Sequence, residues 1–175
     1  VAGPGNPPVV VDETADLDRA ARCIIRGGAY DNNLLCISEK EVFVVDKVFD
    51  AMMAAMERAG AVRLNPSEVD ALTKVAITTV GEGNQRHQVP ARDFLGQDAA
   101  VLARGIGKKI PAEVEMIFGE TEESNPFVPV EQMMPFIPVV RMPDVDAAIA
   151  AAVRAEHGHG HTAVIHSRYI DNVTK

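Results

Sequence analysis

The stretch VVVDETADLDRAARCIIRGG, residues 9–28, decides the fold. Its three β-branched residues follow a Gly/Pro-rich segment and predict a short buried strand. Apolar residues then recur at helical spacing, and Thr14 or Asp16 can cap this helix because their side-chain oxygens accept from free backbone N–H groups. Gly27-Gly28 is expected to end the helix. The stretch therefore predicts the strand and helix that open a βαβ unit.

The same alternation of strands and helices continues along the chain and predicts an α/β fold, a mostly parallel sheet flanked by helices. A proline-rich segment cannot form a central strand, because proline has no N–H to donate to the ladder. The further expected strands are 42–45, 114–118, 136–140 and 162–166, the further helices are 48–59, 65–72, 92–103 and a segment from 143, and the loops are 78–90 and 126–130.

Composition limits the classes of function. The 175 residues fit one globular domain, and because the sequence does not open on Met we expect a piece of a longer chain. A net charge of -8, spread along the chain, argues against a nucleic-acid partner, which requires a basic face. No apolar run approaches the ~20 residues of a membrane span, so no membrane partner is expected. Two distant cysteines favour a reducing compartment over a disulfide framework.

Cys36 is the first candidate for chemistry. It follows the polar turn 31–33, and a loop can hold a reactive side chain in a cleft between rigid elements. The alternative is a small buried hydrophobe, as most free cysteines are. Cys23 lies in the middle of a predicted helix beside apolar residues and is interpreted as structural.

Histidines alternate with glycines over 157–161, and Glu131 lies in a proline-flanked loop. No metal site is predicted, because no nearby cysteine or carboxylate pair completes a tetrahedral set. An imidazole can assist Cys36 only if the fold brings them together. Glu131 is either a ligand-binding carboxylate or a solvated surface group. The glycines form no nucleotide cradle, so another domain must bind most of any nucleotide.

Residues 5–16, GNPPVVVDETAD, together with residues 30–42, YDNNLLCISEKEV, resemble the CoA-acylating aldehyde dehydrogenases. These are the propionaldehyde and acetaldehyde dehydrogenases associated with bacterial microcompartments. The segments Asp-Asn-Asn-x-x-Cys and Glu-x-x-x-Pro in this order are a specific signal. The likeness extends over nearly the whole chain, through 126–127, 131–135, 144–148 and 161–168.

The resemblance implies that residues 1–175 are the catalytic domain of the aldehyde dehydrogenase fold. An NAD-binding Rossmann-like domain and a C-terminal segment would lie outside this chain, which is therefore expected to be inactive alone. The implied enzyme oxidises a short-chain aldehyde to acyl-CoA through a cysteine thioester, with NAD as cofactor and coenzyme A as co-substrate. It is expected to be a homo-oligomer, dimer or tetramer, in the cytoplasm or inside a microcompartment.

The resemblance also implies roles for single residues. Cys36 matches the family's nucleophile, and Glu131 matches the carboxylate that holds the nicotinamide ribose. Met133 stands where the wider superfamily usually has a Phe beside the nicotinamide, and His161 matches a family histidine, a catalytic candidate whose role is open. Ala2 stands where hydrolytic relatives carry the glutamate that activates water, so transfer to CoA is favoured over hydrolysis.

Two alternatives stay open at this point. One is a hydrolytic or semialdehyde NAD(P)-dependent aldehyde dehydrogenase, which product analysis with and without CoA would separate. The other is a non-catalytic domain in which the cysteine is incidental, and equally slow labelling of the two thiols would favour it.

Overall fold

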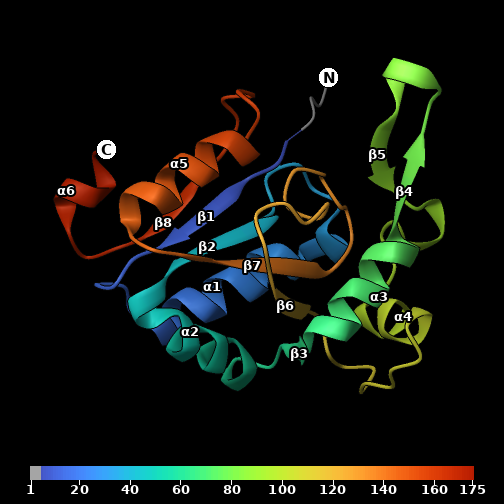
Figure 1. Ribbon diagram of the computed structural model, residues 1–175. Coiled ribbons are helices and arrows are strands. Elements are labelled where there is room, and N and C mark those ends of the chain that lie inside the picture. Colours follow the sequence, from blue (N-terminus) through green and yellow to red (C-terminus); the bar gives the residue numbers. More distant parts are fainter. Residues whose placement is uncertain (1–4) are drawn as a thin grey trace.

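The computed structural model describes residues 5–175, so Ala2 lies outside the described residues. The chain forms a six-stranded, fully parallel sheet in the order β3-β6-β7-β2-β1-β8 (Figure 1). The predicted α/β class is confirmed. The strands are β1 (Pro8–Val11), β2 (Glu41–Val45), β3 (Val62–Leu64), β6 (Ile117–Thr121), β7 (Phe136–Met142) and β8 (Val164–His166).

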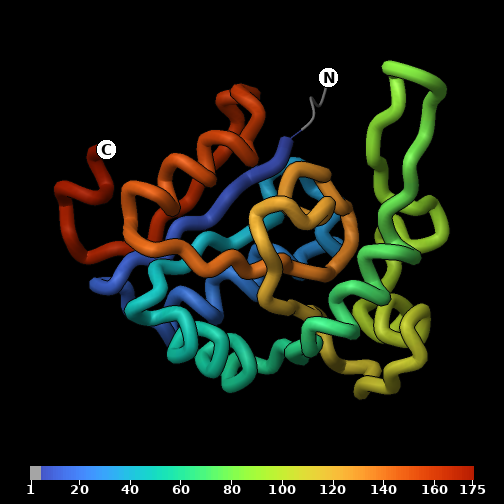
Figure 2. The backbone as a smooth tube through the Cα atoms, viewed as in Figure 1, coloured from blue at the N-terminus to red at the C-terminus, as the bar shows by residue number. Residues whose placement is uncertain are grey.

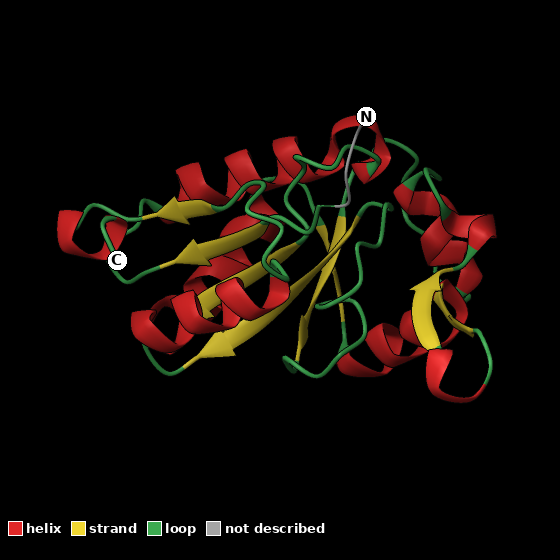
Figure 3. Cartoon of the chain, turned by 90° about the horizontal axis from the view of Figure 1, so that it is seen from above, coloured by secondary structure: helices red, strands yellow, loops and turns green. Residues whose placement is uncertain are grey.

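Helices cover both faces of the sheet, as Figure 3 shows from above. One face packs on α1 and α2, and the other packs on α3, α4 and α5. Because both faces are buried, the strands carry unbroken apolar runs such as the one over β1. The helices are α1 (Leu17–Ala29), α2 (Asp46–Arg58), α3 (Pro66–Ala76), α4 (Ala99–Gly105), α5 (Val145–Ala155) and α6 (Ile170–Val173).

Local signals placed most helix starts correctly. The Asp16 side chain accepts from the Arg19 N–H at 3.1 Å and caps α1. Asn65 and Glu68 form a capping box at the start of α3, where Pro66 occupies the first turn. None of the helices within residues 5–175 is long and apolar enough to cross a membrane.

The predicted end of the first helix at Gly27-Gly28 is wrong, because α1 continues to Ala29. A Cβ atom at Gly28 would lie 2.7 Å from Cδ1 of Ile137, so this glycine serves the close packing of α1 on β7. The helix ends instead at the polar turn η1 (Tyr30–Asn33), where Asp31 adopts a φ of 50°.

The segment 78–90 is a hairpin of β4 (Ile77–Val80) and β5 (His87–Pro90), where a loop was expected. It projects from the body of the protein, as the backbone tube in Figure 2 shows. Most of its side chains are exposed, so the alternation of apolar and polar residues that normally reveals a strand is missing.

Smaller differences concern the bounds of single elements and two short elements. The predicted helix 92–103 is split into η3 (Arg92–Phe94) and α4, because Leu95 and Asp98 between them are extended. The strand expected over 114–118 begins later, at Ile117, and the short elements β3 and α6 were not predicted. The proline-rich segment 126–130 is a loop, as expected.

The aromatic pair Phe127 and Phe136 anchors that loop on the sheet. Both rings are fully buried, with their centroids 4.6 Å apart. We expect Phe127→Ala to lower the free energy of unfolding by about 3–5 kcal/mol, through lost burial and the cavity left behind. Urea unfolding measures this loss. Val153→Ala, at a side chain 67% exposed, is the control and should change stability by no more than about 0.5 kcal/mol. A similar small change for Phe127→Ala would contradict the prediction.

Candidate active site

The predicted site residues all precede strands of the parallel sheet. Cys36 comes before β2, Glu131 and Met133 before β7, and His161 before β8. Gly5, for which no role was predicted, comes before β1. Because these strands are parallel, their amino ends lie along one edge of the sheet. The candidate site is therefore opposite to the carboxyl edge at which open α/β sheets usually bind ligands.

The polar turn before Cys36 has an unusual backbone held by its own side chains. Asp31, Asn32 and Asn33 all have positive φ, at 50°, 52° and 66°, a region that Asn and Asp tolerate better than most residues. Nδ2 of Asn32 donates to the Gly96 carbonyl at 2.9 Å, and Nδ2 of Asn33 donates to the Gly28 carbonyl at 2.7 Å. The turn thus fixes the chain that leads into Cys36.

Gly5 joins the two candidate site residues Cys36 and Glu131. A Cβ atom at this position would lie 2.5 Å from the carbonyl oxygen of Cys36, so only glycine allows so close an approach. The Gly5 N–H also donates to Oε2 of Glu131 at 3.4 Å. The half-buried Cys36 and the Glu131 loop therefore meet on either side of one backbone segment.

Lys40 is a site residue that sequence reasoning missed. Its side chain is 0% exposed, and Nζ donates to the carbonyl and to Oδ1 of Asn33 at 2.6 and 2.7 Å. Nζ also lies 3.9 Å from Oε1 of Glu131. Burial lowers the pKa of Lys40 to about 8, against the charges of Glu131, Glu41 and Cys36, which act to raise it. No local signal distinguishes this lysine from an exposed one, because only the packing buries it.

The loop that carries Glu131 is fixed on its other side. Buried Gln132 donates through Nε2 to the carbonyl oxygens of Lys40 and Phe136, at 2.7 and 2.9 Å. The half-buried Met133 has a φ of 48°, and its carbonyl accepts from the Gly96 N–H at 3.0 Å. Backbone strain of this kind persists only where the surroundings determine it, and it is common at ligand sites.

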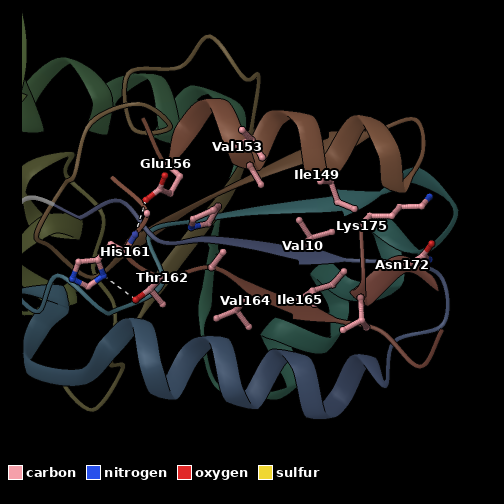
Figure 4. Close-up of a pocket in the computed structure, with 15 residues that line it drawn as sticks. Val10, Ile149, Val153, Glu156, His161, Thr162, Val164, Ile165, Asn172 and Lys175 are labelled. Carbon is pink, nitrogen blue, oxygen red and sulfur yellow. Dashed lines mark hydrogen bonds between the residues drawn. The ribbon is translucent and has the colours of Figure 1, made fainter. Parts of the chain in front are cut away.

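The histidine loop contributes to two different cavities. His161 is exposed, and its Nδ1 lies 2.8 Å from the Thr162 hydroxyl, beside a cavity of about 530 Å³ under α5 (Figure 4). His157 and His159 instead line a cavity of about 260 Å³ together with Gly5 and Glu131. Within residues 5–175, no hydrogen bond joins His161 to Cys36 or to Glu131, so the role of His161 stays a prediction.

The other cysteine is outside this arrangement. Cys23 is exposed on α1, in a shallow hollow that Glu39 and Tyr30 also line. Cys23 does not pack in the core, because the face of α1 that enters the core is the one with Ala20 and Ile24, and its structural role stays a prediction.

Comparison with known proteins gives a consistent result. The family described as "Aldehyde dehydrogenase family" matches residues 2–175. The acetaldehyde dehydrogenase (acetylating) of Salmonella typhimurium is 45% identical over 174 residues, which are 99% of this chain and 37% of that protein. The chain thus spans a little over a third of the length of this relative.

Solved structures share the fold over nearly the whole chain. The propionaldehyde dehydrogenase of Rhodopseudomonas palustris, solved with bound CoA and an acylated cysteine, is 37% identical with a TM-score of 0.91. The propionaldehyde dehydrogenase of the Clostridium phytofermentans fucose utilisation microcompartment is 40% identical with a TM-score of 0.90. In both cases the match covers 99% of this chain and 38% of the other.

The carboxyl group of Glu41, the first residue of β2, should make the free energy of unfolding depend on pH. Burial raises its pKa well above 4.5, Oε1 lies 3.4 Å from Nδ2 of Asn6, and Oε2 has no partner within the described residues. The folded protein thus keeps a proton that the unfolded chain loses, so the free energy of unfolding falls as pH rises above 4.5, by at most about 1.4 kcal/mol per pH unit.

We expect Glu41→Gln to flatten this dependence and to be more stable than the wild type at about pH 8, since an amide stays neutral at every pH. Urea unfolding across pH measures the slope. Glu122→Gln, at an exposed position, is the matched control and should keep the wild-type slope. An unchanged slope in Glu41→Gln would show that the buried carboxyl does not cause it.

Proposed function

The chain belongs to the aldehyde dehydrogenase family, and on this premise we propose that residues 1–175 are the catalytic domain of a CoA-acylating aldehyde dehydrogenase. The enzyme oxidises acetaldehyde or propionaldehyde to the acyl-CoA. The observation that carries the proposal is the meeting of Cys36 and Glu131 at Gly5. The acetylating relative and the CoA-bound, cysteine-acylated structure support it.

Covalent catalysis by Cys36 divides the oxidation into two easier steps. The thiolate adds to the aldehyde carbon and forms a tetrahedral adduct with an oxyanion. The backbone N–H of Cys36, with a donor from outside this chain, stabilises that oxygen, where fixed dipoles are most effective. Loss of the former aldehyde hydrogen as hydride leaves a thioester on Cys36, and attack by the CoA thiol on this thioester then releases acyl-CoA and the free cysteine.

The residues at the amino edge fit one end of the nicotinamide cofactor. The cavity beside Glu131 measures about 260 Å³, below the ~300–1,000 Å³ of a complete ligand pocket. It suits the nicotinamide ribose, whose hydroxyls the carboxylate of Glu131 would accept from, and the family resemblance assigns Met133 to the nicotinamide ring. NAD, when bound, supplies the hydride acceptor. The Rossmann-like domain that binds the rest, and a C-terminal segment, lie outside this chain.

His161 is retained as a catalytic candidate, an exposed residue that lines the larger of these two cavities. The full-length enzyme works as a homo-oligomer, dimer or tetramer, in the cytoplasm or inside a bacterial microcompartment. The microcompartment origin of the similar Clostridium phytofermentans enzyme supports the second location.

The central test is Cys36→Ser in the full-length enzyme. We expect CoA-dependent NADH formation from acetaldehyde to fall by more than about a thousandfold, because the attacking atom is lost. Absorbance at the NADH band measures the rate, and Cys23→Ser is the matched control with wild-type activity. Retained activity in Cys36→Ser would refute the proposed nucleophile. Formation of free acid by the wild type without CoA would favour the hydrolytic alternative.

Residue 2 provides a test of acyl transfer against hydrolysis. We expect Ala2→Glu to raise the ratio of free acid to acyl-CoA about tenfold or more, because a positioned carboxylate can activate water. Ala2→Gln has the same shape without the base and should keep the wild-type ratio. Chromatography of the products measures both species, and equal ratios in the two variants would contradict this interpretation of residue 2.

A further inference from the structure

Lys40 carries a buried charge at the junction of the two site loops. Its side chain is 0% exposed, and burial of an ammonium group is costly unless partners compensate. Two of its donors go to the carbonyl and Oδ1 of Asn33, at 2.6 and 2.7 Å. The ammonium group also approaches Glu131, whose Oε1 lies 3.9 Å from Nζ. The ammonium group therefore contacts the Cys36 loop and the Glu131 loop at once.

The contact with the Cys36 loop is rigid. Asn33 lies three residues before Cys36, and its own amide donates to the carbonyls of Gly28 and Glu39 at 2.7 and 2.9 Å. Its two oxygens are then both taken by Lys40. The backbone carbonyl of Lys40 also accepts from Gln132, which lies in the Glu131 loop. Lys40 is therefore hydrogen-bonded to both loops and fixes their relative position.

The contact with Glu131 differs in kind, because 3.9 Å is an ion-pair distance and too long for a hydrogen bond. It depends on the charge of Lys40. The groups that face Lys40 are Glu131, Glu41 and the Cys36 thiol. Glu131 is the carboxylate within ion-pair distance of Nζ, whereas Oε1 of Glu41 accepts from Nδ2 of Asn6 and burial raises the pKa of Glu41. On its other oxygen, Glu131 accepts from the Gly5 N–H that lies against Cys36.

We propose that Lys40 is a positioning residue for the nicotinamide end of the cofactor. Its ammonium group holds the Glu131 carboxylate beside Gly5 and so sets the ribose-binding group at a fixed place relative to Cys36. The inference rests on the proposed function, because it takes Glu131 to bind the ribose. When Lys40 loses its proton, Glu131 loses its counter-ion and the ribose site loosens.

The consequence is a pH-dependent affinity for NAD. Burial has lowered the pKa of Lys40 to about 8, so its charge is present at pH 7 and largely lost at about pH 9. We expect the Kd of NAD in the wild-type background to rise about tenfold between these pH values, because Glu131 loses its buried counter-ion. In Lys40→Met the Kd at pH 7 should already equal the wild-type value at pH 9 and should not change with pH.

The measurement is calorimetric titration of NAD into the full-length enzyme. All variants carry Cys36→Ser, so that ionisation of the thiol and turnover do not contribute. Lys47→Met, at an exposed lysine on α2, is the matched control and should show the wild-type pH dependence. If Lys40→Met does not fold, Glu131→Gln tests the same inference. This variant should bind NAD weakly, with a Kd that does not depend on pH.

Two results would overturn the inference. One is a wild-type Kd that does not change between pH 7 and pH 9. The other is a pH dependence that persists unchanged in Lys40→Met or in Glu131→Gln. The proposed function is tested separately by CoA-dependent NADH formation in the enzyme with Cys36 intact. A failure of that reaction is thus distinguishable from a failure of the positioning role.

Discussion

Parallel pairing of β1 with β2 and β8, and of β2 with β7, constrains everything else in this protein. It places the chain segments that precede four strands along one edge, although they are far apart in sequence. At the carboxyl end of β1, Asp12 accepts from Thr14 and from Nδ2 of Asn172 at 2.7 and 2.8 Å. The segments that precede β1, β2, β7 and β8 carry the candidate site residues, so the site lies along the amino edge.

Buried polar residues concentrate at that amino edge, where packed apolar side chains would stabilise the fold at a lower cost of desolvation. Replacing a buried ion by packed apolar groups is often neutral or stabilising, so stability alone does not account for Lys40. The network instead ties two loops to one geometry, which is what a preorganised site requires. The buried polar side chains next to the site are Asn6, Asn33, Ser38, Lys40, Glu41 and Gln132.

Prediction from sequence succeeded where a local pattern determines the structure. The β-branched run of β1 and the Asp16 cap act within a few residues, so each can be recognised in the sequence without knowledge of the fold. It failed for the β4–β5 hairpin, whose strands face solvent and show no apolar periodicity. It also failed at Gly28, where a glycine serves packing against Ile137 rather than helix termination.

The sequence by itself determined the α/β class and the two loops that carry Cys36 and Glu131, because hydrophobic period and motif order are properties of short segments. Only the tertiary structure decided that these loops meet at Gly5, that Lys40 is buried between them, and that His157 and His159 reach the Glu131 cavity while His161 faces another. The contacts of Gly5 and Lys40 with Glu131 join residues more than ninety positions apart in the sequence, and no local pattern encodes such contacts.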